Sequence, residues 1–129
     1  MGYNYRLPNI NAALGCAQLE LLPRFLEVKR ALAKRYRSVL DRIAGVRFIA
    51  ESEGSKSNYW LITILLNEDL KKNKEQIIKL LHGKKIMVRP AWKLLNKISY
   101  LNKFPRMNLS NSVNLFERII NLPSSAGIV

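Results

Sequence analysis

The sequence has little cysteine, and this limits both its crosslinking and its chemistry. Its 129 residues contain one cysteine, Cys16, so an internal disulfide is excluded. A chain without disulfides suits a reducing compartment, and we expect a cytoplasmic location. Cys16 stands among small residues, and we interpret it as a small core residue rather than a nucleophile.

Long apolar runs are also absent. The longest useful run, residues 59–66, is far below the ~18 residues that a membrane-spanning helix needs. Residues 1–6 lack the basic and apolar regions of a signal peptide. We therefore expect no membrane span. The hydrophobic content of 48% is nevertheless enough for a folded core.

The residue types that carry most enzyme chemistry are scarce. The sequence has one histidine, His82, and nine acidic residues. It has no metal-ligand cluster, Gly-x-Ser-x-Gly motif or glycine-rich phosphate loop. His82 stands before Gly83 at the expected end of a helix, where we interpret it as a solvated side chain. The sequence alone does not describe a complete active site, and we assign no catalytic residue in it.

Basic residues greatly outnumber acidic ones, and the formal net charge is +13. Such a surface attracts nucleic acid, anionic lipid or phosphorylated ligands. The basic residues are spread along the chain, however, and no zinc-finger spacing, RNP-like motif or helix-turn-helix accompanies them. Three interpretations stay open: solvated helix faces, an acidic partner segment that is missing, and a stand-alone module that binds nucleic acid or another polyanion.

The length of 129 residues predicts one domain over residues 1–129. We expect Pro23 to break or kink the chain between the first two helices. The helices are expected at residues 8–21, 24–44, 73–82 and 110–118, with Ser110 as a candidate N-cap. Strands are expected at residues 46–49, 59–66, 86–89 and 119–123, with Pro90 ending the third. This order predicts an α/β protein of the α+β type, a two-layer sandwich with long N-terminal helices and a small, mainly antiparallel sheet.

Two segments are more specific than a generic domain requires. In residues 2–15, polar and aromatic side chains precede a helix, and the helix start with Asn4 and Arg6 suits an anion. An ordinary capped helix start explains this pattern equally well. In residues 87–92, Arg89 and Trp92 follow a strand and can grip a carboxylate or phosphate and stack on a ring. A surface arginine beside a core tryptophan is the alternative.

The same segments resemble the DegT/DnrJ/EryC1/StrS family of sugar aminotransferases, which depend on pyridoxal phosphate (PLP). The resemblance runs over essentially the whole chain and is most specific in its first motif. Its motifs are Gly2-Tyr3-Asn4-Tyr5-Arg6 with Ala12-Ala13-Leu14-Gly15, Asn58-Tyr59-Trp60-Leu61, Arg89-Pro90 with Trp92, and Asn121-Leu122-Pro123-Ser124-Ser125. The second and third motifs look most like the branch that makes 4-amino-6-deoxy sugars for surface glycans such as lipopolysaccharide.

The resemblance implies a fold-type-I homodimer that transfers an amino group, usually from glutamate, to a nucleotide-linked keto sugar. It implies that Asn4 reaches the phosphate of the neighbouring subunit's PLP, with Tyr5 and Arg6 near that shared site. Arg89 and Trp92 are implied to lie in the region that lines the substrate cleft. Many relatives have a histidine where this sequence has Asn96, which puts a histidine-dependent substrate contact in doubt.

The resemblance also implies that the chain is the C-terminal small domain without its large domain. In the family, the lysine that binds PLP and the aspartate that pairs with its pyridine nitrogen lie upstream of the matching region. No lysine of this sequence stands in the corresponding motif. We therefore expect the chain to be inactive alone, to bind PLP unstably, and to associate with itself through the surface that the large domain would cover.

Overall fold

A computed structural model describes residue 3 and residues 5–128 of the chain. It has the helices α1 (Asn9–Leu40), α2 (Lys74–Gly83) and α3 (Ser110–Arg118) and the strands β1 (Val46–Phe48), β2 (Ile62–Leu66), β3 (Arg89–Pro90) and β4 (Ile119–Leu122). Short 3-10 helices lie at Glu68–Asn73, Leu95–Lys97 and Ala126–Ile128. The four strands form one antiparallel sheet in the order β1-β2-β4-β3. The predicted small antiparallel sheet packed with helices is confirmed.

The core lies on one face of this sheet, against the second half of α1 and against α2. Alternate residues of β2 point to this face, and Ile62 is completely buried there. Leu32 and Ala33 of α1 and Ile78 of α2 join the same apolar cluster. Leu65 is buried outside the cluster, on the opposite face, where α3 approaches β2. α1 and α2 therefore cover one face of the sheet, and α3 approaches the other.

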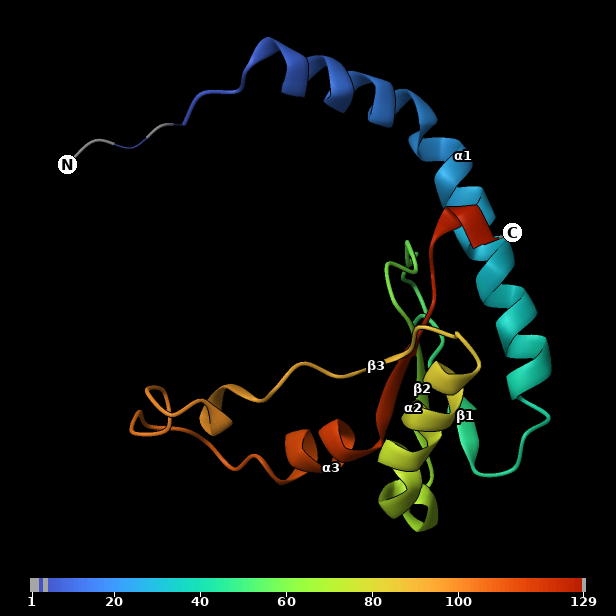
Figure 1. The fold of residues 1–129 in the computed structure, drawn as a ribbon, viewed down its shortest axis with the longest axis vertical. Helices are drawn as coiled ribbons and strands as arrows, with labels where there is room; N and C mark the ends of the chain where they lie inside the picture. The colour runs from blue at the N-terminus through green and yellow to red at the C-terminus, as the bar shows by residue number, and fades with distance from the viewer. Residues whose placement is uncertain (1–2, 4, 129) are drawn as a thin grey trace.

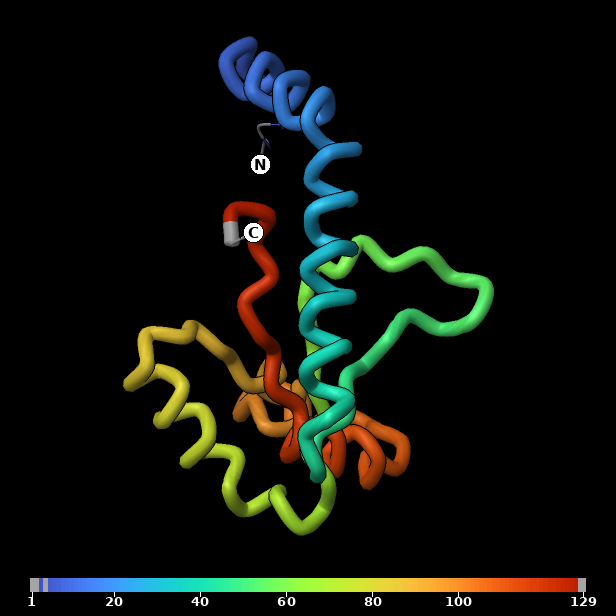
Figure 2. Tube along the Cα trace, turned by 90° about the vertical axis from the view of Figure 1, so that its right-hand side faces the viewer, coloured from blue at the N-terminus to red at the C-terminus, as the bar shows by residue number. Residues whose placement is uncertain are grey.

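α1 is one continuous helix rather than the two that the sequence predicts, and Pro23 lies inside it. Proline removes one helical hydrogen bond and bends the axis, but it does not end a helix whose flanking residues still form their own bonds. Figure 2 shows the bend in the first half of the helix, and Figure 1 shows this half projecting beyond the sheet. The predicted break at Pro23 is wrong, and the predicted kink is present.

The projecting half of α1 exposes apolar side chains, including Ile10, Leu14 and Leu19. Cys16 is also exposed, so its interpretation as a core residue is wrong. The small residues around it lie on a helix face that no described element covers. None of the helices in the described ranges combines the length and apolarity needed to cross a bilayer.

Other predicted elements are present with shifted bounds. The predicted strand 59–66 begins only at Ile62, because Tyr59 has a left-handed backbone with φ +45°. The predicted strand 86–89 is reduced to Arg89–Pro90, and Pro90 belongs to it instead of ending it. Proline is tolerated there because β3 is an edge strand and needs no donor on its outer side.

Two local predictions are also corrected. α3 begins at Ser110, but its capping position is Leu109, and Asn108 Oδ1 accepts the Ser110 N–H at 2.8 Å. His82 is exposed, yet it is not merely solvated, because its Nε2 lies 2.7 Å from the Val88 carbonyl oxygen. This contact ties the end of α2 to the chain just before β3.

Lys74 joins the start of α2 to the end of α3. Its side chain is buried, and Nζ donates to the Phe116 carbonyl at 2.6 Å while lying 4.8 Å from the centre of the Phe116 ring. Burial lowers the pKa of this ammonium group. A cation at the C-terminal end of α3 also offsets the partial negative charge of the helix end.

Candidate functional site

A cavity of about 610 Å³ lies beside β3 and β4 and holds both tryptophans of the chain. Trp60 and Trp92 stack with ring centres 5.8 Å apart and planes inclined by 29°. Arg89 and Asn121 also line the cavity. The two indoles are 66% and 68% exposed. The alternative in which Trp92 is a core residue is therefore excluded.

The backbone around Trp60 is held from several directions. The left-handed Tyr59 turns the chain just before Trp60, and Ser57 Oγ accepts the Tyr59 N–H at 3.0 Å. Asn58 Oδ1 accepts the Trp60 N–H at 2.9 Å, and Ser124 Oγ donates to the Trp60 carbonyl at 2.6 Å. These bonds fix the direction in which the indole leaves the chain.

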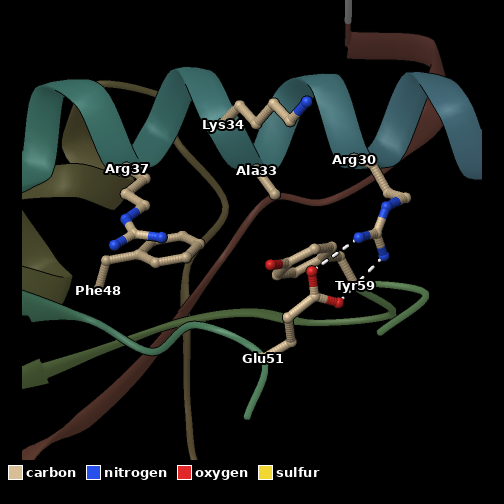
Figure 3. Close-up of a pocket in the computed structure, with 7 residues that line it drawn as sticks. All are labelled: Arg30, Ala33, Lys34, Arg37, Phe48, Glu51 and Tyr59. Atoms are coloured by element: carbon tan, nitrogen blue, oxygen red, sulfur yellow. Dashed lines mark hydrogen bonds and ion pairs between the residues drawn. The ribbon is translucent and has the colours of Figure 1, made fainter. Parts of the chain in front are cut away.

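Behind this turn, an ion pair connects the loop to α1 (Figure 3). The Arg30 guanidinium donates to both Glu51 carboxylate oxygens, at 2.7 and 3.1 Å, and to the Ser57 carbonyl at 2.5 Å. Glu51 also accepts the Ser57 N–H at 2.6 Å. The hydrogen bonds from Arg30 hold the pKa of the Glu51 carboxyl below its usual value. We call Arg30, Glu51 and Ser57 the loop clamp.

The loop clamp borders a second, smaller cavity of about 120 Å³, which includes Phe48 and Tyr59. Figure 3 shows the Glu51 carboxylate turned toward Arg30, beside the Tyr59 ring. The Arg30 guanidinium lies 5.6 Å from the centre of that ring. The Glu51 carboxylate and the Arg30 guanidinium are already paired with each other. We therefore interpret the residues of this cavity as holding the loop in place and not as catalytic groups.

On the other side of the large cavity, Asn121 of β4 lies between β2 and β3, and β3 carries Arg89. Asn121 is 9% exposed and lies opposite both Thr63 and Arg89 in the sheet. Its Oδ1 accepts from Thr63 Oγ1 at 2.8 Å, and its Nδ2 lies 3.4 Å from the Pro90 carbonyl. Sequence reasoning did not place Asn121 in the site. The available signal was a polar residue inside an otherwise apolar strand.

The cavity has the size of a small-molecule site. Of the described residues that line it, Arg89 alone is charged, and none carries a carboxylate. In the described residues, no group of three or more His, Cys, Asp or Glu side chains is placed to hold a metal ion. The arrangement can bind an anion with an attached planar group. Among the described residues, no histidine, cysteine or lysine side chain lines the cavity.

The model of the DegT/DnrJ/EryC1/StrS aminotransferase family matches residues 1–129, the whole chain. This chain belongs to that family. One relative is EpsN of Bacillus subtilis, named as a candidate pyridoxal phosphate-dependent aminotransferase, with 37% identity over 99% of this chain. Another is the GDP-perosamine synthase of Vibrio cholerae, with 34% identity over 99% of this chain. The chain spans only about a third of these relatives, 34% and 35% of their lengths.

Solved structures of aminotransferases show the same fold. PseC of Helicobacter pylori, an aminotransferase involved in the biosynthesis of pseudoaminic acid, superposes with a TM-score of 0.91 at 24% identity. All of this chain and 35% of that one are covered. A family aminotransferase from Brucella abortus gives a TM-score of 0.84 at 23% identity, again over all of this chain and 34% of the other.

The structure brings together some of the residues that family resemblance selects and separates others. Arg89 and Trp92 line the same cavity. Asn96 lies in a different, mostly apolar cavity of about 370 Å³, and its buried Oδ1 has no hydrogen-bond partner among the described residues. Tyr5 and Arg6 are exposed in the segment before α1 and line neither cavity. Asn4 lies outside the described residues.

Proposed function

We propose that this chain is the small-domain portion of a PLP-dependent aminotransferase that aminates a nucleotide-linked keto sugar for surface-glycan synthesis. The observation that carries the proposal is the family match over residues 1–129. The names of its relatives agree, because they include GDP-perosamine synthases and transaminases named for UDP- and dTDP-linked amino sugars. The enzyme takes its amino group from glutamate and works in the cytoplasm as a homodimer.

The described lysines do not fit the role of binding PLP covalently. Lys74 is buried, but its Nζ is bonded to a helix-end carbonyl and faces an aromatic ring. Glu75 and Glu117 lie near enough to favour its positive charge, so this ammonium group is part of the packing between α2 and α3. The cofactor, which supplies the electron sink for transamination when it is bound, therefore belongs to a large domain in the complete enzyme. The chain alone is inactive and does not hold PLP stably.

The contribution of this chain is to complete sites that it does not contain by itself. Asn4 contacts the phosphate of the neighbouring subunit's PLP, and Tyr5 and Arg6 lie near that shared site. Arg89, Trp92 and Asn96 belong to the substrate-binding region, although Asn96 lies in a different cavity from the other two. The exposed apolar half of α1 packs against the large domain, and in its absence against another copy, so the isolated chain self-associates.

Two proteins test this function. The purified chain is incubated with PLP, glutamate and GDP-4-keto-6-deoxymannose, and no amino sugar is expected. A chimera joins this chain to the Vibrio cholerae GDP-perosamine synthase in place of the matching third, and it is expected to bind PLP and form product. Amination by the chain alone would contradict the proposal, and so would a folded, PLP-bound chimera with no activity on any nucleotide-linked keto sugar.

A net charge of +13 favours one other function, a stand-alone module that binds nucleic acid or another polyanion. The two functions differ in how binding responds to salt and sequence. A dedicated module would bind RNA or DNA tightly, with affinity falling steeply as salt rises. Weak binding that is indifferent to sequence and lost at physiological salt would leave the aminotransferase assignment in place.

A further inference from the structure

We infer that the surface between α1 and α2 is a docking groove for an acidic amphipathic helix of a partner protein. The proposed function uses the first half of α1 and the cavities near β3, and it leaves this surface unassigned. The inference therefore goes beyond that function and does not depend on it.

Two largely apolar cavities lie against the helices that cover the core. One, of about 300 Å³, is lined on α1 by Leu32, Arg35, Tyr36 and Val39. The other, of about 330 Å³, is lined on α2 and the segment before it by Leu70, Asn73, Gln76, Ile77, Leu80 and Leu81. Residues of both cavities pack against the same buried apolar cluster: Tyr36 from the first, and Leu70, Ile77 and Leu81 from the second.

On α1, the cavity lies on the side that is turned away from β1. Arg30, Lys34 and Arg37 occupy the opposite side, where they border the small cavity next to β1 (Figure 3). Because β1 is one edge of the sheet, the side of α1 with Arg35 and Val39 faces the middle of the sheet. Figure 2 shows α2 beside the second half of α1 in this direction.

On α2, the cavity is turned away from β3, the other edge of the sheet. His82 contacts Val88 just before β3, and Leu80 lies on a different side of the helix because a helix turns about 100° per residue. Leu70, which lines the same cavity, lies beside Gly45, just after α1. The two cavities are therefore the facing walls of one groove, which we call the helix groove.

The helix groove exposes apolar side chains in a helical pattern. Leu80 is 58% exposed and Val39 is 60% exposed. Lining residues recur at i, i+4 and i+7 on each wall: Leu32, Tyr36 and Val39 on α1, and Asn73, Ile77 and Leu80 on α2. Apolar residues at this spacing form ridges that pack against another helix, and an apolar groove accepts the apolar face of an amphipathic helix.

The charges around the helix groove favour an acidic partner. Arg35 lines the α1 wall, and Lys84 lies one turn beyond Leu80, because the Lys84 N–H donates to the Leu80 carbonyl at 3.2 Å. None of the described residues that line the two walls is acidic. A partner with carboxylates beside its apolar face would therefore meet cations and no like charge in the walls.

The acids of the neighbouring helix segments are directed elsewhere. Asp41, which caps α1, pairs with Arg37 on the β1 side of that helix. Glu75, the one acid in α2, lies nearly opposite Ile77 around the helix. Neither acid neutralises the cations at the helix groove.

A helix fits the shape of this surface better than a membrane does. The apolar residues lie on two facing walls, whereas a membrane surface binds the outward apolar face of a single amphipathic helix. A bound helix would place its apolar side between the walls and its carboxylates near Arg35 and Lys84.

Fluorescence anisotropy with synthetic helices tests the inference on the full chain. The probe is a fluorescein-labelled peptide of about 16 residues, roughly 24 Å long as a helix, with leucines at i, i+3, i+4 and i+7 and glutamates on its other face. One control peptide has lysines in place of the glutamates, and another has the same residues with the leucines spread around the helix. At physiological salt we expect saturable binding of the probe and binding about tenfold weaker or more for both controls.

Variants of the chain then locate the binding site. Leu80→Asp and Val39→Asp should each weaken probe binding about tenfold or more, whereas Leu95→Asp, at a leucine that is 69% exposed outside the helix groove, should bind like the original chain. Arg35→Gln should weaken binding several-fold, and Arg47→Gln, at an exposed arginine of β1, should not. Because these side chains are exposed, the variants should fold, and circular dichroism checks this.

Equal binding of the glutamate and lysine peptides would overturn the inference, and so would equal losses in Leu80→Asp and Leu95→Asp. Absence of saturable probe binding would overturn it as well. Sedimentation with vesicles of equal parts phosphatidylglycerol and phosphatidylcholine tests the membrane alternative. If Leu80→Asp abolishes vesicle binding, Leu95→Asp does not, and the probe peptide fails to bind, the helix groove binds a lipid surface and the inference is wrong. None of these outcomes bears on the proposed function, because no residue of the helix groove is assigned to PLP or substrate.

Discussion

Replacing Gly45 with alanine should destabilise the domain through two separable effects. Gly45 lies in the turn between α1 and β1 with φ +81°, a left-handed conformation that costs a residue with a side chain about 1–2 kcal/mol. A Cβ atom added there would lie 2.5 Å from Leu70 Cδ1, so the leucine must move. Since Cδ1 is the end of a side chain packed against the core, we expect this to cost about 1 kcal/mol more.

A second glycine provides the control that separates the two effects. Gly54 has φ +74° and nothing within 4 Å of an added Cβ atom, so Gly54→Ala carries the backbone cost without the overlap. Urea unfolding monitored by circular dichroism gives the free energy of unfolding for both variants. We expect a loss of about 2–3 kcal/mol for Gly45→Ala and about 1–2 kcal/mol for Gly54→Ala.

A double-mutant cycle then tests the overlap itself. In the background of Leu70→Ala, the penalty of Gly45→Ala should shrink to that of Gly54→Ala, because the clashing atom is gone. If Gly45→Ala instead lowers the free energy of unfolding equally in both backgrounds, an overlap with Leu70 does not contribute to the loss. If Gly45→Ala costs nothing at all, the left-handed turn before β1 is wrong, and the reasoning fails.

Three further predictions concern the loop clamp, the sheet and the kink. Arg30 lowers the pKa of Glu51, so Glu51→Gln should reduce the free energy of unfolding by its full amount above about pH 4.5. Urea titrations should show this difference between the variant and the original chain vanishing as the pH falls through the lowered pKa. A difference that does not change with pH would contradict this. Asn121→Ala should lower the free energy of unfolding by about 0.5–1.5 kcal/mol, because the half-buried Thr63 hydroxyl loses its acceptor; an unchanged unfolding midpoint would exclude that bond. Pro23→Ala should restore one helical hydrogen bond and slow amide hydrogen exchange in residues 9–22, and exchange as fast as in the original chain would show that proline does not limit this half of α1.

Much of the secondary structure could be predicted because its signals are local. β2 and β4 are short apolar runs, and α3 has a polar start and a helical apolar pattern, so their predicted positions are close to the observed ones. The continuity of α1 could not be predicted, because a proline weakens a helix without determining whether the two sides remain joined. The exposure of Cys16 was missed because small apolar neighbours indicate a packing surface but not whether that surface is covered.

The candidate site was predictable only where its residues are neighbours in sequence. Arg89 and Trp92 are three positions apart at one strand end, and the structure keeps them in one cavity. Trp60 and Asn121 reach it through the pairing of β2, β4 and β3, which no local pattern specifies. The same applies to the contact between Arg30 and Glu51, because the path of the intervening chain decides it.

The position of β4 within the sheet sets the order in which the chain can fold during its synthesis. β4 lies between β2 and β3, although both of those strands leave the ribosome earlier. The hydrogen bond between the Thr63 and Asn121 side chains can form only after Asn121, 58 positions later, has been synthesised. Until then, β2 has β1 as its one strand neighbour in the described sheet, and its other edge is open to pairing with nascent chains nearby. Slow translation of the segment between them should therefore prolong the period in which this protein is prone to aggregate.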